Sequence, residues 1–156
     1  MLPSGENGRL TETVESITLK GRSASKGVAE GEALVTTDAI SFLSDISVTE
    51  GIITSPQSKC KGQSVAGKIL VFPTGRGSTA DPYGFYMLKK AGKAPKGVVN
   101  IDANPTTVAG AIISNTPMVY KLDRNPSDVI ETGDHVLVDG DKGVITVIKQ
   151  VKGSHR

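Results

Sequence analysis

The spacing of hydrophobic positions changes midway along the chain, from patterns typical of strands to an alternation of strands and helices. In the first half, residues 16–20, 31–36 and 51–54 carry alternating or β-branched patterns separated by glycine and serine, which predicts strands. Residues 39–43 fit either a short helical turn or a strand edge, and the pattern does not decide between them. Residues 69–72 form an apolar run, which predicts a strand over residues 68–72 that is covered on both faces.

Helices are expected in the second half wherever Asp or Asn precedes proline, because that pair is typical of an N-cap followed by the first helical residue. Such pairs predict helices over residues 82–91 and 104–114, and a short helix that starts at residues 125–126 and ends near residue 133. Strands are expected at residues 97–101 and 118–120, and residues 134–148 have the pattern of a β-hairpin. The chain is therefore predicted to be an α/β protein with a β/β/α architecture.

The segment Gly75-Arg76-Gly77-Ser78-Thr79 joins the apolar strand to the helix expected at residues 82–91. Its glycines permit backbone angles that other residues avoid and allow a close approach to the main chain. Ser78 and Thr79 stand just before a helix N-terminus, where unpaired amides and the helix dipole favour negative charge. The segment is either an ordinary turn with capping hydroxyls or a site where a serine holds an anionic substrate or transfers a proton.

Length and composition describe one ordinary globular domain. The chain has 156 residues, of which 37% are hydrophobic and 22% charged. The expected organisation is a flexible extension over residues 1–13, the domain over residues 14–151 and a flexible tail over residues 152–156. A net charge of +2 with scattered positive residues argues against nucleic-acid binding. The absence of a long apolar run or signal-peptide pattern argues against a membrane protein and leads us to expect a cytoplasmic location.

Cysteine and histidine are too few for several kinds of site. Cys60 is the only cysteine, so no internal disulfide is possible, and His135 and His155 are the only histidines. The usual Cys and His ligands of zinc or iron–sulfur sites are therefore missing, and a Ser-His-Asp arrangement is unconvincing. His135 lies in an alternating pattern and is predicted to be a surface residue of a strand.

Several motifs, in order and with suitable spacing, resemble the small subunit of aconitase X. They are GVAEGEALV (27–35), ISFL (40–43), SVAGKILVFP (64–73), GRGST (75–79), KAP (93–95), GAII (110–113) and TPMV (116–119). The resemblance extends from about residue 17 to residue 147. It implies the swivelling β/β/α fold of the mobile domain of aconitases, and a hydro-lyase that removes water from a small hydroxy acid.

The resemblance also implies roles for individual residues and for a partner. Ser78 matches the serine expected to act as the catalytic base, and Gly75, Arg76, Gly77 and Thr79 are expected to surround the substrate. Arg76 is suited to pair with a carboxylate or phosphate, or is a solvated loop residue; Thr79 orients the substrate or caps the helix. The expected partner is a large, cysteine-bearing subunit that holds an iron or iron–sulfur centre, so that this chain itself binds no metal.

Two substrates occur in this family: cis-3-hydroxy-L-proline and mevalonate 5-phosphate. Archaeal small subunits of this family carry a Gly-Ser-Thr-Val-Gly-Ser-Tyr pattern after the glycine turn. This chain is similar to it but has Ala80, Asp81 and Pro82 in place of Val-Gly-Ser. An aspartate near the site would repel a phosphate and attract an ammonium group, which favours the hydroxyproline substrate; the alternative role of Asp81 is the helix N-cap. The mevalonate 5-phosphate reaction is the main alternative, and a non-catalytic anion-binding module is a further one.

Overall fold

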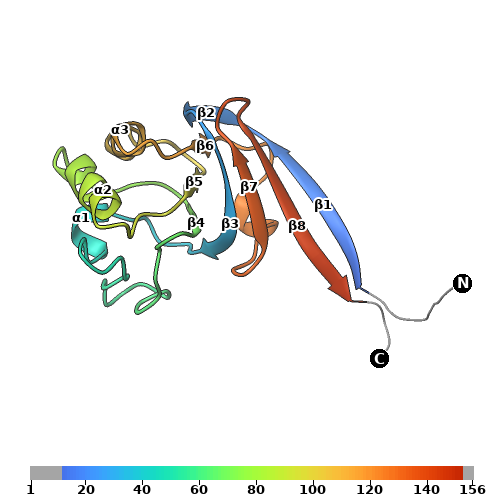
Figure 1. The fold of residues 1–156 in the computed structure, drawn as a ribbon, viewed down its shortest axis with the longest axis horizontal. Coiled ribbons are helices and arrows are strands. Elements are labelled where there is room, and N and C mark those ends of the chain that lie inside the picture. Colours follow the sequence, from blue (N-terminus) through green and yellow to red (C-terminus); the bar gives the residue numbers. More distant parts are fainter. Residues whose placement is uncertain (1–11, 153–156) are drawn as a thin grey trace, which may run out of the picture.

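The computed structural model describes residues 12–152, and its elements follow the predicted change from strands to alternating strands and helices (Figure 1). The strands are β1 (Glu12–Lys20), β2 (Arg22–Ser25), β3 (Val28–Val35), β4 (Ile69–Phe72), β5 (Gly97–Asn100), β6 (Met118–Tyr120), β7 (His135–Asp139) and β8 (Val144–Lys152). The helices are α1 (Phe42–Asp45), α2 (Asp81–Lys90), α3 (Pro105–Ile113) and the 3-10 helix η1 (Pro126–Asp128).

The strands within residues 12–152 form one eight-stranded sheet in the order β1-β8-β7-β3-β4-β5-β6-β2. Neighbours from β3 to β6 are parallel, and the remaining pairs are antiparallel. β3 belongs to both the antiparallel and the parallel part of the sheet, because residues 28–32 pair with β7 whereas residues 33–35 pair with β4. The sheet therefore bends at β3 into two β-layers, and helices α1, α2 and α3 cover the outer face of the parallel layer (Figure 1).

Two hydrophobic cores join the three layers, and β4 contributes to both. Leu70 and Phe72 enter the core beneath the helices, whereas Ile69 and Val71 enter the core between the two β-layers. This alternation follows from the two-residue period of a strand. It confirms the predicted strand with both faces covered, and it confirms the predicted α/β class with β/β/α layering.

The first half of the chain departs from the predicted elements in two places and decides a third that the sequence left open. Residues 51–54 take part only in isolated bridges, because Gly51 and Gly62, both with positive φ, turn the chain on either side. β2 is missed by the pattern, because it is short and lacks a run of large apolar residues. The undecided residues 39–43 contain a bridge at Ile40 and then the start of α1.

Most elements of the second half agree with the sequence. β5, α3, β6 and the β7–β8 hairpin lie where they are predicted, and the helix expected after residue 125 is only the 3-10 turn η1. The predicted extension (residues 1–13) and tail (residues 152–156) lie outside the described residues, apart from residues 12, 13 and 152 in β1 and β8. Within residues 12–152, no helix is long and apolar enough to cross a bilayer.

Candidate active site

The turn between β4 and α2 covers residues 73–80 and is fixed by the segment that follows β3. Ile40 and Gly75 form a parallel bridge, in which the Ile40 amide donates to the Thr74 carbonyl at 3.2 Å. The Arg76 amide donates back to the Ile40 carbonyl at 2.9 Å. Parallel pairing therefore continues past the end of β4 and holds the chain until just before Ser78.

The start of α3 holds the same turn from the other side. The Asn104 side-chain amide donates to the Gly75 carbonyl at 2.8 Å, and the Thr106 hydroxyl lies 3.3 Å from the Gly77 carbonyl. Asn104 is also the N-cap of α3, as predicted, because its Oδ1 accepts from the Thr106 amide at 2.9 Å. One residue therefore starts the helix and fastens the turn.

Gly75 and Gly77 are required for close packing and not for unusual backbone angles, which corrects one half of the sequence interpretation. Neither residue has a φ in the left-handed region. A Cβ atom on Gly75 would clash with the Thr107 hydroxyl, and one on Gly77 would clash with the Asp81 carboxyl group. The close approach to the main chain is thus made by the protein's own side chains.

Ser78 and Thr79 lie directly before α2, as the sequence predicts, and the structure shows that both are exposed. The Ser78 carbonyl accepts from the Asp81 amide at 3.0 Å, which closes the turn. Among the described residues, the amides of residues 77–80 donate to no other backbone group. These N–H groups and the N-terminus of α2 therefore favour negative charge near the Ser78 hydroxyl.

Asp81 is not the N-cap of α2 that the sequence predicts. α2 begins at Asp81 itself, and its N-cap is Ala80, which makes no side-chain cap. Asp81 is 1% exposed, and its carboxylate accepts from the Ser41 hydroxyl at 2.7 Å and from the amides of Phe42 and Leu43 at 3.1 and 3.0 Å. The negative charge is directed at the N-terminus of α1 and not at the exposed surface of the turn.

Arg76 forms an ion pair with Asp45, the last residue of α1. Arg76 Nη2 lies 2.5 Å from Asp45 Oδ1, and the two side chains are 52% and 8% exposed. Half of the arginine side chain therefore stays accessible beside the turn, where its remaining donors can meet a carboxylate or phosphate. Arg76 also lines an open cavity of about 420 Å³, which is formed with residues 37–40, 45, 46, 53, 55, 57 and 58.

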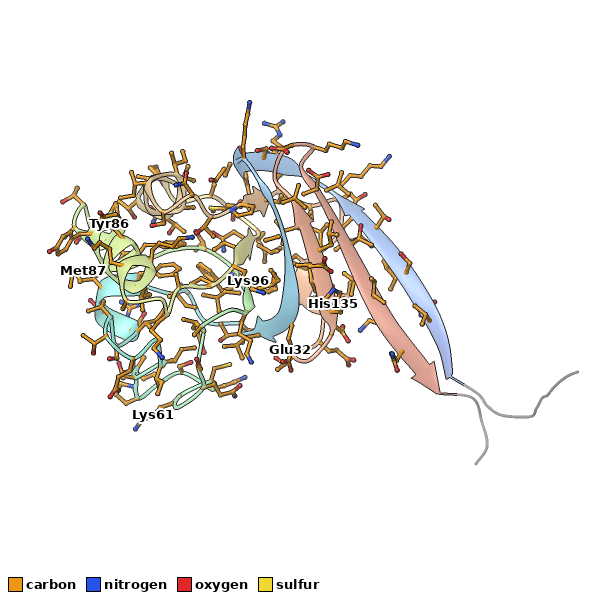
Figure 2. All side chains as sticks on the ribbon, in the orientation of Figure 1. Glu32, Lys61, Tyr86, Met87, Lys96 and His135 are labelled. Carbon is orange, nitrogen blue, oxygen red and sulfur yellow. The ribbon has the colours of Figure 1, made fainter. Side chains whose placement is uncertain are left out.

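His135 and the aromatic residues of α2 lie outside the turn at residues 73–80. His135 is exposed on β7, with its Nε2 atom 2.6 Å from Glu30 Oε1, which confirms the predicted surface position (Figure 2). On α2, Phe85 is buried whereas Tyr83 and Tyr86 are exposed. Figure 2 shows Tyr86 at the outer end of the helical layer.

The donor groups of residues 12–152 do not fit an iron or iron–sulfur centre. No group of three or more His, Cys, Asp and Glu side chains among them could hold a metal ion. Cys60 is buried, and its thiol lies 3.5 Å from the Val35 carbonyl. Burial raises the pKa of the Cys60 thiol, a hydrogen bond with Thr36 lowers it, and the nearby Asp38 charge raises it further.

Sequence reasoning missed Ser41, Asp45 and Thr106 as residues that shape the site. Each contacts the turn or its flanking residue Asp81 across 29 to 40 positions of sequence, so no local pattern connects them. The one available signal was a serine before an apolar pair at residues 41–43, which is typical of a helix start.

The fold and the turn together define a class of protein: a β/β/α domain that presents a serine hydroxyl on a fixed turn at the carboxyl end of a parallel strand. Residues 18–147 match the family model of the aconitase X swivel domain. The chain belongs to this family, which confirms the resemblance found in the sequence.

Relatives agree with this assignment over nearly their whole length. The phosphomevalonate dehydratase small subunit of Methanosarcina acetivorans is 45% identical, with 88% of this chain and 95% of that subunit covered. The corresponding small subunit of Thermococcus kodakarensis is 44% identical, with 84% and 96% covered. A crystal structure of Thermococcus kodakaraensis aconitase X in its holo-form gives a TM-score of 0.81 at 44% identity, over 85% of this chain and 99% of that chain.

Proposed function

We propose that this chain is the small subunit of a mevalonate 5-phosphate dehydratase and that Ser78 is the general base of the reaction. The observation that carries the proposal is an exposed serine on a turn fastened from two sides, beside amides that have no backbone acceptor among the described residues. Support comes from relatives named phosphomevalonate dehydratase small subunit, which are 40–45% identical over 81–88% of this chain.

The chemistry assigned to Ser78 is proton removal. Mevalonate 5-phosphate is a 3-hydroxy acid, so loss of water takes a proton from the carbon next to the carboxylate and a hydroxyl from the following carbon. Ser78 Oγ accepts that proton. A serine hydroxyl must first be ionised to act as a base, and the amides of residues 77–80 together with the N-terminus of α2 lower the cost of negative charge on its oxygen.

The position of Asp81 supports mevalonate 5-phosphate over cis-3-hydroxy-L-proline. Asp81 would repel a phosphate only if its carboxylate faced the substrate. Asp81 is instead buried, and its charge is met by three donors at the start of α1. Arg76, the amides of residues 77–80 and the Thr79 hydroxyl are left beside Ser78, and a carboxylate or phosphate suits them better than an ammonium group does.

A large partner subunit completes the proposed enzyme. The relatives are small subunits, and the described residues of this chain do not fit a metal centre. We therefore assign the iron or iron–sulfur centre, and assistance to the departing hydroxyl, to the large subunit.

The test is a dehydration assay on the complex of this chain with its large subunit, in which ultraviolet absorbance monitors the reaction. Mevalonate 5-phosphate is expected to be dehydrated, and Ser78→Ala is expected to lower kcat by about two to four orders of magnitude, the usual worth of a general base. The matched control is Ser23→Ala, because Ser23 is an exposed serine on β2, outside the turn. Its kcat is expected to stay within about twofold of the wild type.

Other outcomes discriminate among the alternatives. Turnover that survives in Ser78→Ala contradicts the assignment of the base. Turnover with cis-3-hydroxy-L-proline but not with mevalonate 5-phosphate contradicts the substrate. An intact, metal-loaded complex that is silent with both, and that loses only anion affinity in Ser78→Ala, identifies a non-catalytic binding module.

A further inference from the structure

The four-residue helix α1 is anchored to the elements on either side of the Ser78 turn. Phe42, its first residue, stacks on Phe85 of α2 with ring centroids 4.3 Å apart, and meets Phe72 at the end of β4 edge-on at 6.1 Å. All three rings are buried. Because β4 leads into the turn and α2 leads out of it, α1 has a fixed position relative to both ends of residues 73–80.

Two carboxylates connect α1 to the turn at different points. Asp81 follows the turn and binds the N-terminus of α1, while its amide closes the turn on the Ser78 carbonyl. Asp45 belongs to α1 and binds the guanidinium of Arg76. One contact therefore fixes the backbone at Ser78, and the other fixes the direction of the Arg76 side chain.

Ser41 joins these two carboxylates. Its amide donates to Asp45 Oδ2 at 2.8 Å, and its hydroxyl donates to Asp81 Oδ1 at 2.7 Å while accepting from the Ser44 amide at 3.1 Å. All three are buried: counted over the whole residue, Ser41 is 4% exposed, Asp45 6% and Asp81 1%. Buried polar groups that satisfy one another in this way hold a single arrangement, since a partner lost from any of them leaves an unpaired group.

We propose that Ser41, Asp45 and Asp81 form a clamp (the α1 clamp) that positions the two groups facing the substrate, Arg76 through Asp45 and Ser78 through Asp81. The inference rests on the proposed function, in which Arg76 binds an anionic group and Ser78 removes a proton. None of the three clamp residues needs to touch the substrate. They act by holding the geometry that proximity and electrostatic stabilisation require.

The clamp predicts that its two carboxylates affect different kinetic constants. Asp45→Asn weakens the hold on Arg76 and is expected to raise KM by about tenfold or more with kcat within about threefold, because it disturbs binding. Asp81→Asn places an amide group against three donors and is expected to lower kcat by about tenfold or more with KM within about threefold, because it displaces Ser78. A purely structural role would change stability without this split.

Asp134→Asn is the matched control. Asp134, like Asp45, pairs with a basic side chain (Lys149, at 2.6 Å) and accepts from a backbone amide (Glu131, at 2.8 Å). It directly precedes β7 and does not belong to the turn at residues 73–80. It is expected to change stability while kcat and KM stay within about twofold. Steady-state kinetics, thermal unfolding and assembly with the large subunit are measured for every variant.

A double mutant tests the path through Arg76. If Asp45 acts only by orienting that side chain, Asp45→Asn has no further effect on KM in an Arg76→Ala background. A general loss of structure would instead raise the KM of the double mutant above that of Arg76→Ala. Should Asp81→Asn fail to assemble, Ser41→Ala removes one donor to the same carboxylate and is expected to lower kcat by about threefold to tenfold.

The results separate this inference from the proposed function. A wild-type complex that depends on Ser78, combined with Asp45→Asn and Asp81→Asn kinetics like those of Asp134→Asn, overturns the clamp alone. Additive KM effects of Asp45→Asn and Arg76→Ala, or unchanged kcat in Ser41→Ala, also overturn it. A wild-type complex without dehydration, or full turnover in Ser78→Ala, overturns the proposed function itself.

Discussion

The hydrogen atom that Gly77 carries in place of a side chain leaves room for the Asp81 carboxyl group. This space is why a fully buried acid can lie four residues after Gly77 and still reach α1. The atoms that require a glycine at position 77 belong to the protein itself, so Gly77 is part of the internal packing of the turn.

Gly77→Ala is therefore expected to push the Asp81 carboxylate away from α1. The expected cost is about 1–3 kcal/mol in the free energy of unfolding, the usual penalty of overpacking, together with a lower kcat. Denaturant unfolding and steady-state kinetics measure the two effects. Gly92→Ala serves as the comparison, because Gly92 has a φ of +73° but no atom within 4 Å of an added Cβ. It is expected to lose stability without losing activity, and equal losses of activity in the two variants would contradict the packing argument.

Individual residues of the site were predictable from sequence only where the signal is local. Ser78 and its place before α2 follow from a strand, two glycines and a helix start in succession. The role of Asp81 did not follow, because an Asp-Pro pair has the pattern of an N-cap and the partners of this carboxylate lie 38 to 40 positions away. A local pattern identifies a polar residue near a helix end but does not say which helix it serves.

At the scale of elements, α3 depends on a cap that also holds the turn. Asn104→Ala removes the acceptor for the Thr106 amide and the donor to the Gly75 carbonyl. The expected loss is about 1–2 kcal/mol in the free energy of unfolding, at the upper end for a helix cap, measured by chemical denaturation.

Two comparisons separate the cap from the fastening of the turn. Asn125→Ala removes the cap of the exposed turn η1 and is expected to cost about 1 kcal/mol or less. Asn104→Asp keeps the acceptor for α3 but lacks the donor to Gly75, so it is expected to keep most of the stability and to lower activity. Stability losses as large for Asn125→Ala as for Asn104→Ala would show that the second hydrogen bond contributes nothing.

Elements with both a strong hydrophobic period and a clear boundary were predictable, and the others were not. β4, α3 and the β7–β8 hairpin combine the two signals. β2 has neither: it is four residues long and pairs with β6 across a register irregularity. α1 has only four residues, and it forms because Asp81 and Phe42 connect it to α2, which is tertiary information.

For the whole molecule, the alternation of strand and helix patterns was enough to predict three layers, but not the bend at β3. One continuous strand serves two partners in opposite senses, and its sequence carries no mark of the change from β7 to β4. Helices α1, α2 and α3 lie on one side of the parallel layer, which leaves the antiparallel strands to cover the other (Figure 1).

The antiparallel layer contains an ion pair that makes the stability of the fold change with pH in the alkaline range. Lys149 Nζ lies 2.6 Å from Asp134 Oδ2 and 3.4 Å from Glu131 Oε1. The hydrogen bond to Asp134 raises the pKa of Lys149 above its ordinary value, against an opposing effect of burial. Since the folded pKa is the higher one, the pair stabilises the fold fully below the unfolded pKa, and this contribution is lost as the pH rises through the folded pKa.

Thermal unfolding of the wild type and Asp134→Asn between about pH 7 and pH 11.5 tests this dependence. The difference in Tm is expected to stay constant up to the ordinary lysine pKa of 10.5 and to shrink above it. Glu131→Gln, whose carboxylate is 82% exposed and more distant, is expected to show a smaller difference throughout. A Tm difference that grows with alkaline pH would reverse the assigned sign.

The carboxylate at position 81 also restricts how this domain can evolve. An acid there needs a residue without a side chain at position 77, a hydroxyl at position 41 and donating amides at positions 42 and 43, so these places depend on one another although they lie apart in the gene. A substitution at one of these positions alone is expected to destabilise the domain, so we expect the positions to change together or not at all. Grafting residues 73–81 onto another domain of this fold would require residues 41–43 to be transferred with them.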